Sequence, residues 1–331
     1  MRKLKYAFLL FFIICATLHT NAQGTLPIYS DYLSDNIFIV HPSAAGIGNS
    51  AKLRMTQREQ WNGVGNSPSL QTLSFHGTLS QNTAIGALVF NDKNGFHSQI
   101  GIQGAYAYHL NFRNAEALNQ LSFGLATSYV QNTLDQTKFV DFDPVVSQVI
   151  ESDAYFNADL SFAYHNLDGF AYVTIKNIVL NARQDINPEF KSLNLRRYLL
   201  NVGYFFGRGK NLQFEPSAMF QYIEATNEKL LDVNAKVYQT FGRTARVWLA
   251  LSYRRSLDRN DLQELSLLTP IAGIEFNRFL IAYTYTHQLG GLIVRDGGFH
   301  QITLGINLFN RRRSNRGYNS RYNSFLYKTN N

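Results

Sequence analysis

The sequence predicts an all-β fold: a single antiparallel transmembrane β-barrel of about fourteen strands. Three observations predict it. Apolar residues alternate with small or polar ones in segments of about ten residues, charged residues are few, and aromatic residues are abundant. The segments lie between residues 53 and 309. Because successive strand residues point to opposite faces of a sheet, each segment has one apolar face.

The clearest segment spans residues 121–129, where every second side chain is large and apolar and Ser, Gly or Ala stands between most of them. The same pattern occurs at 100–110, 156–164, 200–206, 212–222, 247–253, 279–285 and 302–308. The weakest segments are 52–59, 170–176 and 265–276. The last of these is broken by Pro270, which has no N–H group for a sheet ladder.

A soluble β-sandwich also alternates, so the face opposite the apolar one decides between the two folds. Here that face is rich in Gly, Ala, Ser, Asn and Gln, and only 16% of the chain is charged, whereas about 25% is usual in soluble domains. A tilted strand of about ten residues rises roughly 23 Å, which is close to the apolar band of a membrane barrel. Tyr at segment ends, as in Tyr108, Tyr129, Tyr164 and Tyr222, suits the interfacial girdles of such a barrel. These features favour the membrane barrel over a secreted sandwich.

Residues 1–22 have the order of a secretory signal peptide. Arg2, Lys3 and Lys5 precede an apolar run at 6–16, and a small residue stands at the expected cleavage site. About eleven apolar residues are too few to span the roughly 30 Å hydrocarbon layer. The one cysteine, Cys15, lies in this run. The mature chain is therefore expected to have neither disulfides nor Cys-bound metals.

The rest of the chain divides into a periplasmic lead-in at 23–50, a barrel at 51–309 and a basic tail at 310–331. The formal net charge is +8, of which the signal peptide contributes +3 and the tail +6, so residues 23–309 carry −1. Nucleic-acid binding by the tail is disfavoured in an exported protein. Contact with anionic lipid or with an acidic periplasmic partner is an alternative, and simple disorder is the interpretation we favour.

The connections between segments are predicted to differ in length at the two rims. Residues 91–95 read as a tight turn, and the longest connections are 131–153 and 178–194. Bacterial barrels keep their long loops outside the cell and their short turns in the periplasm.

No catalytic, cofactor or metal site is predicted. His76 lies near Ser74 and His97 beside Ser98, but no Gly-x-Ser-x-Gly turn accompanies either pair. The acidic loop that contains Asp141 and Asp143 lacks the glycine and the ligand order of a calcium loop, so a solvated loop is favoured.

Six motifs occur in order in the first third of the mature chain: Tyr-Ser-Asp-Tyr at 29–32, Pro-Ser-Ala-Ala-Gly at 42–46, Arg-Glu-Gln-Trp-Asn-Gly at 58–63, Pro-Ser-Leu-Gln-Thr at 68–72, Asn-Asp at 91–92 and Tyr-Ala-Tyr at 106–108. By these motifs the chain resembles the PorP/SprF family of outer-membrane proteins, which is associated with type IX secretion and gliding motility. The resemblance runs through the whole mature barrel. The family usually has Asn-Pro-Ala-Tyr-Ala-Gly where this chain has His-Pro-Ser-Ala-Ala-Gly at 41–46. The basic tail is a second departure.

The resemblance implies a location in the outer membrane of a Gram-negative bacterium and a role without catalysis or cofactor. It implies a barrel that docks or anchors a secreted adhesin at the cell surface. The implied partners are membrane lipid, the secretion machinery and an OmpA-like periplasmic peptidoglycan-binding protein, and no nucleic acid. The alternative function is an outer-membrane pore for solutes or fatty acids.

Candidate partner-docking residues follow from the motifs and the tail. Residues 58–61 place a guanidinium, a carboxylate and a large amphipathic ring at one rim. A structural alternative for the same stretch is an interface-anchoring Trp beside a lumen ion pair. The candidates are Arg58, Gln60, Trp61, Asn91, Asp92, Arg311, Arg312 and Arg313.

Overall fold

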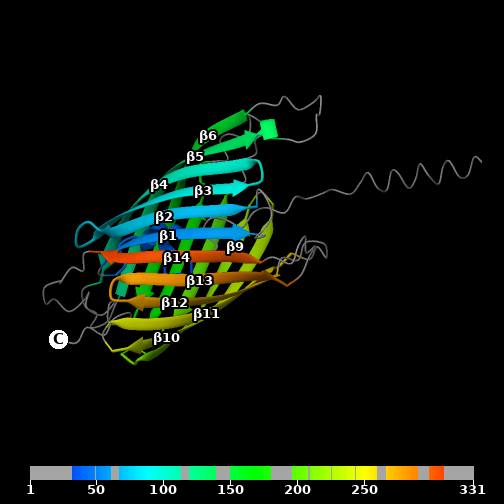
Figure 1. Ribbon diagram of the computed structural model, residues 1–331. Helices are drawn as coiled ribbons and strands as arrows, with labels where there is room; N and C mark the ends of the chain where they lie inside the picture. Colours follow the sequence, from blue (N-terminus) through cyan, green and yellow to red (C-terminus); the bar gives the residue numbers. More distant parts are fainter. Residues whose placement is uncertain are drawn as a thin grey trace, which may run out of the picture.

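The protein is a closed antiparallel barrel of fourteen strands, as predicted (Figure 1). This computed structural model describes residues 32–48, 50–60, 67–112, 119–138, 150–179, 196–207, 209–224, 226–242, 244–258, 266–289 and 298–308. Each strand pairs with its neighbours in chain order, and the last strand pairs with the first. The predicted signal peptide and basic tail lie outside the described residues.

The strands are short at some places in the wall and long at others. They are β1 (Ala51–Gln60), β2 (Ser69–Thr78), β3 (Thr83–Asn94), β4 (His97–Asn111), β5 (Asn119–Asp135), β6 (Ile150–Asn166), β7 (Gly169–Lys176), β8 (Arg197–Tyr204), β9 (Leu212–Ile223), β10 (Glu228–Phe241), β11 (Ala245–Ser256), β12 (Ser266–Phe276), β13 (Phe279–Gln288) and β14 (Phe299–Leu308). Three short 3₁₀ helices accompany them: η1 (Ile37–Ile39), η2 (Pro42–Ala44) and η3 (Gln136–Lys138).

Side chains alternate across the wall as the sequence predicts. On β4, Ile100, Ile102 and Tyr106 face outward with 55%, 55% and 49% of their surface exposed, whereas Gln103 and His109 face inward and are buried. An apolar outer surface and a polar inner surface are what a barrel in lipid requires. Among the described residues, no helix is long and apolar enough to cross a membrane.

The seam between β1 and β14 closes the barrel. Its register runs from the Ala51–Leu308 pair to the Gln60–Phe299 pair. The three weakest predicted segments are all strands, namely β1, β7 and β12. Pro270 has its predicted effect on pairing, because the β12–β13 ladder has no pair at residues 269 and 270.

Eight strands are longer than the predicted ten residues, and β4, β5 and β6 are the longest. β4 has 15 residues, and β5 and β6 have 17 each, so residues 131–135 and 150–153, at the two ends of the connection predicted at 131–153, belong to strands. β7 pairs only with the part of β6 that precedes the turn between them, from Leu160 to Asn166. Alternation alone marks the part of a strand within the lipid and does not show where a hairpin continues beyond it.

The two rims differ as expected. Two-residue turns connect β6 to β7 and β12 to β13, and the chain enters β1 and leaves β14 at this same rim. The connections from β5 to β6 and from β7 to β8 are longer and lie at the opposite rim. The tight turn predicted at 91–95 lies at Gly95 and Phe96 on this rim, because residues 91–94 belong to β3 and pair with β4. By the rule for bacterial barrels, the short-turn rim faces the periplasm and the long-loop rim faces outward.

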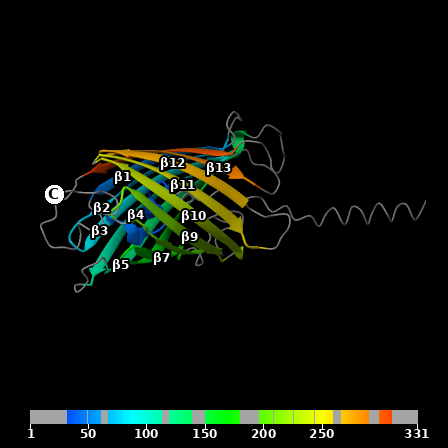
Figure 2. The ribbon, with the colours of Figure 1, turned by 90° about the horizontal axis from the view of Figure 1, so that it is seen from below.

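The sequence predicts a periplasmic lead-in at residues 23–50. The part of it that the structure describes does not extend away from the barrel. Residues 32–48 lie within the ring of strands, where Figure 2 shows them in dark blue. The inner wall carries polar groups that would lack hydrogen-bond partners in an empty, dry lumen. A segment with many backbone and side-chain hydrogen-bonding groups supplies those partners.

The lipid-facing assignment gives a prediction. Replacing Ile102 by Arg places a charge in the middle of the apolar band and is expected to lower the free energy of unfolding by about 2–4 kcal/mol. The matched change Ile150→Arg, on an equally outward residue at the long-loop end of β6, is expected to lower it by about 1 kcal/mol or less. Urea unfolding in lipid vesicles measures both variants, and equal losses would contradict the assignment.

Candidate functional site

Residues 32–48, which we call the plug, occupy the lumen. Their polar contacts reach strands on every side of the barrel, which only a segment inside the ring can do. The hydrogen-bonded pairs are Asn36–Ser74 on β2, Ala45–His109 on β4, Ser43–Ser161 on β6, His41–Thr174 on β7, Tyr32–Asn234 on β10 and Ser34–Thr284 on β13.

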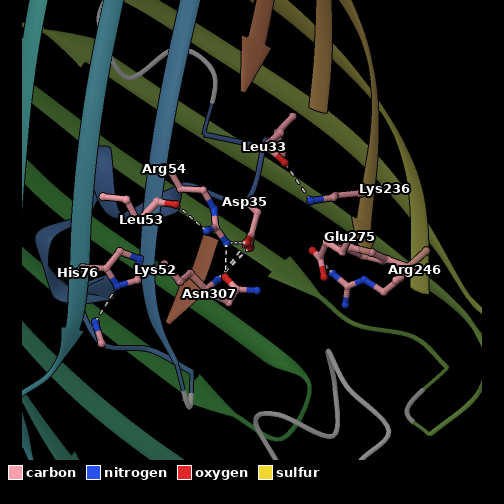
Figure 3. A network of polar contacts seen from close by, with 12 residues as sticks. Leu33, Asp35, Lys52, Leu53, Arg54, His76, Lys236, Arg246, Glu275 and Asn307 are labelled. Carbon is pink, nitrogen blue, oxygen red and sulfur yellow. Dashed lines mark hydrogen bonds and ion pairs between the residues drawn. The ribbon is translucent and has the colours of Figure 1, made fainter. Parts of the chain in front are cut away.

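Asp35 ties the plug to the seam of the barrel (Figure 3). Its backbone φ is +61°, a left-handed conformation that Asp tolerates better than most residues. The carboxylate accepts hydrogen bonds from Lys52 Nζ at 3.0 Å and from Arg54 Nη2 at 2.6 Å, both on β1. Arg54 Nη2 also donates to Asn307 Oδ1 on β14 at 2.8 Å. One carboxylate therefore joins the plug to both strands that close the wall.

The charge state of Asp35 follows from these contacts. Burial alone would raise the pKa of its carboxyl, but the positive charges of Lys52 and Arg54 outweigh burial and hold the pKa below its ordinary value. Asp35 therefore stays ionised at neutral pH, and its bonds to β1 are charge-assisted.

A second set of contacts is a chain of four buried side chains. His41 Nδ1 contacts Thr174 Oγ1, Thr174 Oγ1 contacts Ser161 Oγ, and Ser161 Oγ contacts Ser43 Oγ, each at 2.7 Å. The His41 ring also stacks on Tyr172 with 4.8 Å between centroids. None of the four residues in the chain has exposed surface, so no substrate reaches their hydroxyl groups. The arrangement fastens the plug to β6 and β7.

Glycines in the wall, which have no side chain, make room for the plug. A Cβ atom on Gly124 would lie 2.2 Å from the Ser43 backbone nitrogen, and one on Gly86 would lie 2.4 Å from the Phe38 ring. Gly46 ends the 42–46 motif with φ of +69°, and its own Cβ would lie 2.4 Å from Ala84. Contacts this close are possible only at glycine. The small residues of the alternating pattern therefore have a packing role at these positions.

The wall carries further buried charges that pair with one another. Arg254 and Asp232, on β11 and β10, share two hydrogen bonds of 2.7 Å. The other wall pairs are Arg246–Glu275 at 3.0 Å and Lys176–Asp159 at 3.1 Å. Two lysines of the wall also donate to the plug: Lys176 Nζ to the Ile39 carbonyl at 3.2 Å and Lys236 Nζ to the Leu33 carbonyl at 2.9 Å. Lys236 Nζ lies 3.9 Å from the centroid of the Trp248 ring.

A cavity of about 120 Å³ lies between the plug and the wall. Leu167 and Phe205 line it near the short-turn rim, and Asn201, Glu215 and Lys236 line it further inside. Lys52 on β1 and His76 on β2 also line it, so the plug leaves part of the lumen unfilled.

The structure brings part of the predicted docking set together. Arg58 and Gln60 end β1, Asn91 and Asp92 lie near the end of β3, and all four belong to the long-loop rim. Arg58 and Asp92 pair in register with the same β2 residue, Leu70, from its two sides. We call these four residues the rim cluster. Arg58 faces the lumen whereas Glu59 is exposed on the outer face, so the two are not a pair within the lumen.

The rest of the predicted set cannot be placed with the rim cluster. Trp61 and Arg311 to Arg313 lie outside the described residues. Since β14 ends at Leu308 on the short-turn rim, the tail leaves the barrel at the end opposite to the rim cluster. Sequence reasoning places His41 at the rim or in the lumen, where it lies, but misses the plug residues Asp35 and Ser43. The signal in the sequence that indicates a plug is the set of glycines and charged residues at strand positions whose side chains face the lumen.

In the part of the chain that the structure describes, no group of three or more His, Cys, Asp or Glu side chains could hold a metal ion. The fold, the apolar outer surface and the filled lumen define the class of protein: an integral β-barrel of the outer membrane of a Gram-negative bacterium.

The chain belongs to the PorP/SprF family, since the pattern of the type IX secretion system membrane protein PorP/SprF matches residues 21–306. It is therefore a component of the type IX secretion system, and it associates with the membrane and with the secretion machinery. No curated protein matches its sequence.

Solved structures share the barrel fold at low sequence identity. A deletion mutant of the monoaromatic hydrocarbon channel TodX is 10% identical, with a TM-score of 0.51 over 82% of this chain and 93% of that one. The translocator domain of the autotransporter NalP from Neisseria meningitidis is 11% identical, with a TM-score of 0.37 over 85% and 96% of the two chains. Omp33 from Acinetobacter baumannii is 8% identical, with a TM-score of 0.42 over 80% and 100%.

The glycine contacts give a prediction for the plug. Gly124→Ala is expected to loosen the plug at a cost of about 1–3 kcal/mol, because the new methyl group overlaps the plug backbone. Gly104→Ala is the control, since a Cβ at Gly104 on the neighbouring strand meets nothing within 4 Å. Maleimide labelling of a Ser43→Cys reporter, in a Cys15→Ala background, should rise in the first variant only. Equal labelling of the two would show that Gly124 does not hold the plug.

Proposed function

We propose that this barrel docks or anchors a secreted surface protein, an adhesin, at its long-loop rim and couples to periplasmic partners at its short-turn rim. It does so without catalysis. Membership of a secretion family and the barrel fold both support a non-enzymatic role.

The observation that carries the proposal is the plug. A segment that contacts seven wall strands fills the periplasmic half of the lumen, so the surfaces left for partners are the rims. An open pore for solutes or fatty acids, the alternative function, requires a free lumen. The resting structure supports docking better than steady transport.

The rim cluster supports an extracellular docking site. It combines a guanidinium, a carboxylate and two carboxamides at the ends of β1 and β3, the two strands that flank β2. Such a set offers both hydrogen-bond donors and acceptors to the backbone and polar side chains of a secreted protein. Rigid strand ends hold these groups better than loops do.

The short-turn rim supports the periplasmic half of the proposal. The six cations of the tail follow the last strand at this rim and no acid accompanies them. A basic segment in the periplasm attracts an acidic partner or anionic lipid. We propose that an OmpA-like peptidoglycan-binding protein contacts the barrel on this side.

Cargo display tests the extracellular site. Deleting the gene should leave the outer membrane intact while one adhesin disappears from the cell surface. Arg58→Ala combined with Asp92→Ala should reduce display of that adhesin about tenfold, as the loss of a hot-spot pair does in other interfaces. Lys93→Ala, an exposed cation on the same rim outside the cluster, is the control. Unchanged display of every type IX cargo in the deletion strain would reject the proposal.

Co-purification in mild detergent tests the periplasmic side. The full chain and a chain lacking residues 310–331 are compared for the proteins that they retain. We expect a periplasmic protein to co-purify with the full chain but not with the shortened chain. High salt should also release it from the full chain, because screening weakens contacts between charges. If the two chains retain the same proteins, the tail is not a docking element.

A further inference from the structure

We propose that the plug is displaceable, and that its exit turns the lumen into a water-filled passage for ions and small polar solutes. This activity is separate from docking at the rims, and either can fail without the other.

The wall does not need the plug to remain a barrel. All fourteen ladder interfaces are formed between wall strands, and the described plug contains only the 3₁₀ helices η1 and η2. Its attachments to the wall are side-chain hydrogen bonds, the ion pairs of Asp35 and packing contacts. Removal of the plug leaves every interstrand backbone hydrogen bond in place.

The lining behind the plug contains charged and polar groups that suit water, beside an apolar cluster that includes Leu199, Met219 and Trp248. Arg254 with Asp232, Arg246 with Glu275, and Lys176 with Asp159 are pairs within the wall, so they stay neutralised when the plug leaves. Further amide, hydroxyl and imidazole groups line the inward face. Burying such groups permanently in a dry interior is costly, whereas water solvates them readily. Barrels that conduct have polar interiors of this kind.

The ionic contact of the plug with the seam can be released at one residue. The Asp35 carboxylate holds two cations, Lys52 and Arg54, and the other contacts of Arg54 in the seam are with Asn307 Oδ1 and two backbone carbonyls. Neutralising this one side chain removes two charge-assisted contacts at once. In Figure 3 the Asp35 group stands apart from the Arg246–Glu275 pair, which does not involve the plug.

There is also a direction in which the plug can move. It joins β1 directly at the short-turn rim, and the cavity of about 120 Å³ lies beside it toward that rim. The plug is therefore tethered at the periplasmic mouth and borders unfilled space within the lumen. It can leave toward the periplasm without crossing the membrane.

Conductance of the full chain in planar bilayers tests the proposal. The chain with Cys15→Ala should be almost silent. Adding Asp35→Asn should raise the open probability about tenfold or more, because charge-assisted hydrogen bonds are worth at least that factor each. Lys52→Gln with Arg54→Gln releases the same contact from the wall side, in case the first variant does not fold.

A disulfide lock shows whether the plug itself is the gate. Ser43 Oγ and Ser161 Oγ are 2.7 Å apart, so cysteines at both positions can join plug to wall. In the Asp35→Asn chain this lock should abolish conductance when oxidised and restore it when reduced. The matched wall-to-wall lock, Thr269→Cys with Thr286→Cys, joins β12 to β13 at Oγ1 atoms 3.0 Å apart and should have no such effect. Silence of the folded release variants, or equal conductance of the oxidised and reduced plug lock, would overturn the proposal.

Discussion

The hydrogen-bonded seam between β1 and β14 is the constraint on which the rest of the structure depends. A sheet of fourteen strands has two edges until its first and last strands pair, and exposed edges cannot be tolerated in lipid. Closure also divides the side chains into two environments, one facing hydrocarbon and one facing a lumen. The lumen must then be filled with water or with protein, and here residues 32–48 fill its periplasmic half.

The plug and the wall are matched in shape and in charge. Glycines at 86 and 124 admit a ring and a stretch of backbone that any larger residue would exclude. Asp35 meets two cations of the seam, while most other lumen charges pair within the wall. Shape therefore fixes where the plug sits, and a small number of ionic contacts governs how firmly it is held there. This division allows a closed resting state that remains responsive to one carboxylate.

Most of the wall could be predicted from the sequence, and most of the lumen could not. Alternation identifies even β1, β7 and β12, since a strand between lipid and a polar lumen must alternate whatever its composition. It does not reveal that β5 and β6 continue beyond the lipid. The plug has no periodic pattern, and its partners, such as Ser161 for Ser43, lie far away in the chain. Of the predicted docking residues, Arg58 and Asp92 lie on either side of Leu70 on β2, and this register cannot be read from the sequence.

Chain separation has a consequence for biogenesis. Ser34 contacts Thr284 across 250 residues, and Arg54 contacts Asn307 across 253. Such distant pairings form slowly, because loop-closure entropy must be overcome before they stabilise anything. Until β14 has been exported, β1 lacks one of its two neighbouring strands. The nascent sheet then has two unpaired edge strands and exposes its apolar face to the aqueous periplasm. A chain with this topology therefore requires periplasmic chaperones and an insertion machinery in order to fold into the membrane.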